Sequence, residues 1–188
     1  MTDNVWQKSS AEEAYFNKLE AEKAEKRKKE DAERQKKARL AAVAGTKDDK
    51  LLEQLISIGI DADSFGALQL VPVVAVTWAD GEIAGREKKI VMAAAKKQGL
   101  PTDGPACRLL SSWLERKPAK ENLSAWTHHT RDRCKSLSTD DRKKMKDSLV
   151  ALATEIAQSS GGLLGLGLGA VSDEEAVVIK AVESAFEP

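Results

Sequence analysis

Three carboxylates near the middle of the chain offer the strongest candidate chemistry. Asp80, Glu82 and Glu87 lie around the glycine turn at Gly81, where a helix is expected to begin. Carboxylate oxygens are hard ligands that suit Ca²⁺ or Mg²⁺, so these groups could hold a divalent cation. They could instead only cap the helix, since an acid in the first turn contributes about 0.3 to 1 kcal/mol through the helix dipole. We favour capping, because a calcium-binding EF-hand loop needs more ligands than this spacing supplies.

The two histidines raise a zinc hypothesis. His128 and His129 are adjacent, and Cys134 follows five residues after His129. A structural zinc site needs four ligands, and Cys107 is the only other thiol in the chain. Neighbouring helical residues point about 100° apart, so both imidazoles cannot easily bind one ion. Without an arrangement of serine, histidine and aspartate, the sequence also predicts that the protein is not an enzyme.

Two further segments have the composition of ligand-binding motifs. The glycine-rich residues 161–169 expose backbone N–H groups before a helix, as phosphate loops do. They follow an expected helix instead of a strand and no lysine closes them, so we expect no phosphate loop. Residues 131–146 are the densest basic zone, but acids interrupt it and a solvated helix face is the simpler interpretation. Phosphate contact stays open there, without aromatic platforms for single-stranded bases, and we expect no nucleic-acid partner.

The overall composition excludes several classes of protein. The 188 residues include 30 basic and 30 acidic side chains, so no net charge attracts the chain to nucleic acid or an anionic membrane. The longest apolar runs, 68–79 and 163–170, reach about half of the ~20 residues of a spanning helix, which predicts no transmembrane segment. The N-terminus lacks a secretory pattern, and two cysteines without CxxC spacing suit a reducing compartment. We therefore expect a cytoplasmic protein.

The first 45 residues are expected to form an exposed charged helix ahead of a globular domain, residues 46–188. Glutamate precedes lysine or arginine by four residues, an order that contributes about 0.2 to 0.5 kcal/mol per pair to an isolated helix. These pairs are Glu22/Lys26, Glu25/Lys29, Glu30/Arg34 and Glu33/Lys37. No heptad stripe of leucine or isoleucine runs along the segment, so we expect no long coiled coil. An apolar cluster near its start could bind a partner, although docking on the protein's own core is the simpler interpretation; it comprises Trp6, Tyr15, Phe16 and Leu19.

Apolar periodicity after the charged segment predicts a compact all-α bundle of about seven helices. The polar run 46–49 and Ser64 each offer an N-cap. The valine-rich residues 71–76 could form a strand, but no other segment offers a partner strand. We therefore expect a buried helix, kinked at Pro72, in the middle of the bundle.

A concealed repeat relates the two halves of the expected bundle. Aligning residues 83–91 with residues 171–179 places apolar residues on apolar residues and Glu87 on Glu175. Each copy follows a buried helix and a glycine turn. Two similar helix-turn-helix units, packed face to face, are therefore expected.

The stretch Leu70 to Leu100, with Val-Ala-Val-Thr-Trp-Ala-Asp-Gly-Glu-Ile at its centre, resembles the TerB-like family associated with tellurite resistance and the related N-terminal domain of DjlA co-chaperones. Residues 161–175 are similar to the last part of such proteins, so the resemblance covers roughly residues 48 to 187. It implies an all-helical bundle with no assigned reaction, and acidic residues near the repeat turns that have been proposed to hold a metal ion. The chain departs from the family pattern at Ala84, where a polar cap is expected, and at Ser159-Ser160, which replace an aspartate.

These patterns together predict a non-catalytic interaction module of the TerB-like type, acting in a stress-response assembly with an unidentified protein partner. The charged N-terminal helix would serve as a spacer or as a docking arm. The alternative is a divalent-metal-binding module that holds Ca²⁺ or Mg²⁺ through Asp80, Glu82 and Glu87. A third possibility, an enzyme, requires a deep polar pocket where carboxylates converge.

Overall fold

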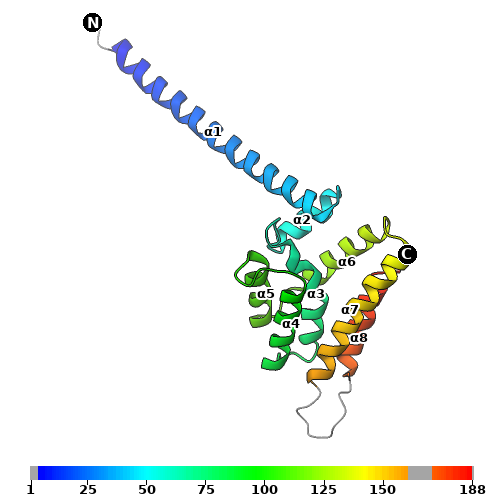
Figure 1. The fold of residues 1–188 in the computed structure, drawn as a ribbon. Helices are drawn as coiled ribbons and strands as arrows, with labels where there is room; N and C mark the ends of the chain where they lie inside the picture. The colour runs from blue at the N-terminus through cyan, green and yellow to red at the C-terminus, as the bar shows by residue number, and fades with distance from the viewer. Residues whose placement is uncertain (1–3, 161–170, 188) are drawn as a thin grey trace. The chain divides into compact units, whose positions relative to one another are not determined.

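The computed structural model describes residues 4–160 and 171–187, and every regular element in these ranges is helical. The predicted all-α fold, with a long charged helix before a compact bundle, is therefore confirmed. The elements are α1 (Asn4–Ala44), α2 (Asp49–Ser57), the 3₁₀ helix η1 (Phe65–Leu70), α3 (Val71–Thr77), α4 (Gly85–Lys97), α5 (Pro105–Glu115), α6 (Lys120–Cys134), α7 (Thr139–Ser160) and α8 (Asp173–Ser184) (Figure 1). The glycine-rich segment singled out above lies outside the described residues. No helix in the described ranges is both long and apolar enough to cross a membrane.

The chain divides into two compact units, residues 1–38 and 39–188. The first is the charged part of α1, where the predicted pair Glu25 and Lys29 is formed at 3.3 Å with both side chains exposed. Exposed pairs of this kind contribute little individually, at most about 1 kcal/mol. The second unit begins inside α1, because Leu40 of this helix is fully buried in the core.

Helix α3 is the central element of the second unit. It packs against α4, α6, α7 and α8, and nearly all its side chains are buried. A short helix that is apolar on all sides must be surrounded by other helices, as the sequence indicated. The strand alternative for this segment is thereby excluded.

The chain enters α3 differently from the prediction. The segment is a 3₁₀ helix, η1, followed by α3, and Pro72 lies in the first turn of α3 instead of kinking one long helix. Proline is tolerated in a first turn because the N–H it lacks would have no helical partner there. The prediction that Ser64 caps this segment is also wrong. Its hydroxyl donates to Asp61 Oδ1 at 2.7 Å and accepts from the Asp61 N–H at 3.0 Å, so the serine closes the preceding turn.

Helices α4, α6, α7 and α8 surround α3, and α2 packs on α6. Asp48 caps α2 as predicted, with Oδ1 accepting the N–H groups of Lys50 and Leu51. Helices α7 and α8 lie side by side (Figure 1). The basic zone 131–146, which was expected to be a solvated face, differs at Arg142, which is partly buried and donates to the Cys134 carbonyl at 2.8 Å. This bond joins the end of α6 to the start of α7.

Candidate functional site

The predicted acidic turn separates into two surface acids and one buried acid. Asp80 and Glu82 are exposed, and Asp80 Oδ1 accepts the Glu82 N–H at 3.1 Å. Glu87 is only 2% exposed, and its Oε2 accepts the Ala84 N–H at 2.7 Å. This bond satisfies a backbone donor at the start of α4, so Glu87 caps this helix. In the part of the chain that the structure describes, no three His, Cys, Asp or Glu side chains are grouped as metal ligands would be.

Glu175 has the same role at the start of α8. Its Oε2 accepts the Ser172 N–H at 2.8 Å, while the Ser172 hydroxyl accepts the Glu175 N–H at 3.2 Å. These two bonds form a capping box, and its glutamate is 5% exposed. At α4 only half of the box exists, because Ala84 has no side-chain acceptor. The two glutamates that the sequence repeat aligned therefore occupy equivalent, buried positions.

The two histidines are directed to different partners. His128 contacts the N-cap residue of α2 and a residue within α2, with Nε2 2.9 Å from Asp48 Oδ2 and Nδ1 2.9 Å from Gln54 Oε1. The pKa of Asp48 is held below its usual value, first by the bond from the Leu51 N–H and then by His128. His129 is buried, and its Nε2 is 3.2 Å from the Ala44 carbonyl oxygen.

No zinc site joins these side chains among the described residues. Cys107 and Cys134 are both buried free thiols. Cys107 Sγ lies 4.0 Å from the Leu100 carbonyl oxygen. Neither histidine contacts this segment of the chain through a hydrogen bond among the described residues. The histidines instead hold α6 against α2 and against the end of α1.

The lowered pKa of His129 predicts that the stability of residues 39–188 depends on pH. Burial, followed by the nearby Arg133 charge, holds its pKa below 6.5 despite the opposing bond to Ala44. The unfolded chain therefore binds a proton first as the pH falls below 6.5, which favours unfolding until the pH passes the folded pKa. We expect the free energy of unfolding to fall between pH of about 7 and about 5, and His129→Gln to reduce that slope. Urea unfolding at a series of pH values measures it; equal slopes in both proteins would contradict the assignment.

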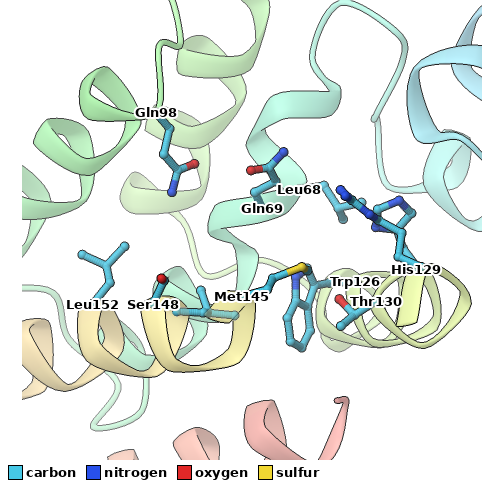
Figure 2. Close-up of a pocket in the computed structure, with 11 residues that line it drawn as sticks. Leu68, Gln69, Gln98, Trp126, His129, Thr130, Met145, Ser148 and Leu152 are labelled. Carbon is cyan, nitrogen blue, oxygen red and sulfur yellow. The ribbon is translucent and has the colours of Figure 1, made fainter. Parts of the chain in front are cut away.

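A pocket lies between η1, the end of α4, α6 and α7 (Figure 2). Its volume is about 200 Å³. The inner wall is largely apolar and is formed by Leu68, Trp126, Met145, Leu149 and Leu152. Polar side chains occur at two levels: buried His129 and Thr130 on the inner wall, and exposed glutamines, a serine and an arginine at the rim.

Thr130 is the unusual member of this pocket. It is fully buried, and none of the described residues forms a hydrogen bond with its hydroxyl oxygen. A buried hydroxyl without a partner costs about 1 to 3 kcal/mol. In Figure 2, Thr130 lies beside the ring of Trp126, one helical turn earlier on α6.

This pocket was not predicted from the sequence. Trp126, Thr130 and Cys134 follow one another at helical spacing on an apolar stripe, which could have marked the threonine as a buried hydroxyl. Its lack of a partner and the proximity of α7 depend on tertiary packing, which one sequence does not give. None of the side chains that line the pocket is a carboxylate.

The chain was compared with known proteins at three levels. No family model, no curated protein and no solved structure matches it. The likeness to the TerB-like family therefore rests on the turn motif and on the repeat.

Proposed function

We propose that this protein is a non-catalytic interaction module of the TerB-like type, and that an aromatic pair on α1 contacts its protein partner. The resemblance implies a stress-response assembly as the setting. The globular unit would be the scaffold, and the charged part of α1 would be the docking arm.

The observation that carries the proposal is the exposure of two large aromatic side chains in a charged helix. Tyr15 is 65% exposed and Phe16 is 61% exposed. Their rings meet edge to face, with centroids 6.1 Å apart. Leu19 lies one turn further along the same face, so the three side chains form the spacing with which a helix binds an apolar groove. Such side chains dominate binding energies because they bury a large area on contact.

The equivalent glutamates support the family part of the proposal. Glu87 and Glu175 each accept a backbone N–H at the start of the second helix of a repeat. Two matching helix-turn-helix units are what the sequence repeat predicts, and an all-helical bundle is what the resemblance implies. Since this architecture carries no assigned reaction in the family, binding is the function that it favours.

Partner capture tests the proposed contact. The tagged full-length protein and a Tyr15→Ser/Phe16→Ser variant are used to recover proteins from a native lysate, with quantification by mass spectrometry. We expect the variant to lose a specific partner at least about tenfold, since hot-spot residues contribute about 2 kcal/mol or more. The comparison is repeated with lysate from tellurite-treated cells, where a stress assembly should be enriched.

The matched control replaces two exposed polar residues on the same turn, Asn17→Ser/Lys18→Ser. It should retain the partner, because it changes the surface without removing an aromatic ring. Equal recovery by the wild type, the aromatic variant and a variant lacking residues 1–38 would show that α1 contributes no contact.

A further inference from the structure

We propose that the pocket between η1, α6 and α7 binds a small aromatic carboxylate. The ring would lie against the apolar inner wall and the carboxylate would bind at the rim. This inference is independent of the contact proposed on α1, since all of its residues belong to the globular unit.

The size of the pocket limits the ligand to a ring system with a short side chain. A cavity of about 150 Å³ holds benzene, and this one has about 200 Å³. A nucleotide or a long acyl chain would exceed it. The inner wall offers Trp126 as a ring for aromatic contact and Met145 as a flexible, polarizable side chain.

The charged side chain that lines the pocket is basic, which favours the binding of an anion. None of the side chains that line it is acidic. Arg133 lies at the rim, and it forms no ion pair with any described residue. A guanidinium presents parallel N–H donors that match the two oxygens of a carboxylate. An exposed arginine beside an apolar cavity therefore favours an apolar acid over a neutral apolar molecule.

Thr130 provides a second reason to expect a ligand with an oxygen atom. Its buried hydroxyl is without a partner in the described part of the chain. Trp126, Thr130 and Arg133 are spaced four and three residues apart, so they share one face of α6. The ring of Trp126, the side chain of Thr130 and the guanidinium of Arg133 thus line the same side of the pocket. Figure 2 also shows the amide of Gln98 pointing toward α7 on the opposite side, where it can donate a further hydrogen bond.

Isothermal titration of the full-length protein with indole-3-acetate and with indole-3-acetamide tests the proposal. The two probes have the same ring and differ in the charge of the side chain. We expect the acid to bind about tenfold more tightly, and Arg133→Gln to remove that difference. Arg131→Gln is the matched control, because Arg131 is an exposed arginine of the same helix that does not line this pocket.

Thr130→Val separates a ligand-binding role from a structural one. It should weaken the binding of both probes several-fold, and it should raise the melting temperature of the free protein because an unpartnered buried hydroxyl is removed. Amide chemical shifts from NMR should change around α6 and α7 when the acid is added. The proposal is overturned if neither probe gives saturable heat at millimolar concentration, if acid and amide bind equally, or if the shifts lie elsewhere.

Discussion

Replacing Val74 with aspartate is expected to unfold residues 39–188. Val74 is 0% exposed at the centre of α3, which packs against four other helices. A carboxylate there would be buried on all sides without a charged partner, at a cost of more than about 4 kcal/mol. Since domains of this size are stable by only about 5 to 15 kcal/mol, most of the native population would be lost. Circular dichroism during thermal and urea unfolding measures the effect.

Val177→Asp is the matched control, because it places the same substitution at a helical valine that is 69% exposed. It lies near the start of α8, where an acid is compatible with the helix dipole. Its stability should stay within about 0.5 kcal/mol of the wild type. A cooperative, wild-type-like melt of Val74→Asp would mean that α3 is not the centre of the core.

The central helix α3 could be predicted from sequence because a helix is the only regular structure in which this segment can be buried without a partner strand. Residues 71–76 have the composition of a strand, and local propensity alone would have selected one. The absence of any partner strand decided the matter, since an unpaired buried strand would leave its backbone groups without hydrogen bonds. The capping role of Glu87 could also be predicted, because this glutamate lies three residues after Ala84, whose N–H it accepts.

Features that depend on a choice between near-equal local partners could not be predicted. Ser64 is a residue type that is common at N-caps, yet its hydroxyl donates to the side chain of Asp61, three residues earlier. Arg142 belongs to a basic run, and only the packing of α7 on the end of α6 brings it to the Cys134 carbonyl. Local patterns therefore identified the helices but not every side chain that joins them.

The candidate site shows the same limit at longer range. His128 and Asp48 are 80 residues apart in sequence, and the residue types near His128 suggested only a zinc ligand. Residues of η1, α6 and α7 line the pocket together, so its inner wall combines residues from 68 to 152. Apolar spacing placed these residues inward, but it did not indicate that they leave a cavity. The volume of such a cavity depends on how closely the helices pack against one another, which a single sequence does not reveal.

Removing both buried glutamates is expected to destabilise the bundle more than removing any surface acid of the same turns. Glu87→Ala and Glu175→Ala each leave a backbone N–H at a helix start without its acceptor. We expect each to lower the free energy of unfolding by about 1 to 3 kcal/mol, as measured by urea denaturation. Because the two helix starts are separate, the double variant should show roughly the sum.

Neighbouring exposed acids provide the controls and also test the metal alternative. Glu82→Ala and Glu174→Ala change the charge beside each buried glutamate, and each should alter stability by no more than about 0.5 kcal/mol. If Asp80, Glu82 and Glu87 held a cation, millimolar Ca²⁺ or Mg²⁺ would raise the melting temperature of the wild type, and Glu82→Ala would abolish that rise. If Glu87 only caps α4, its substitution lowers stability equally with and without the ion. An ion-dependent stability that both Glu82→Ala and Glu87→Ala remove would establish the metal site, because a capping bond to the Ala84 N–H needs no cation.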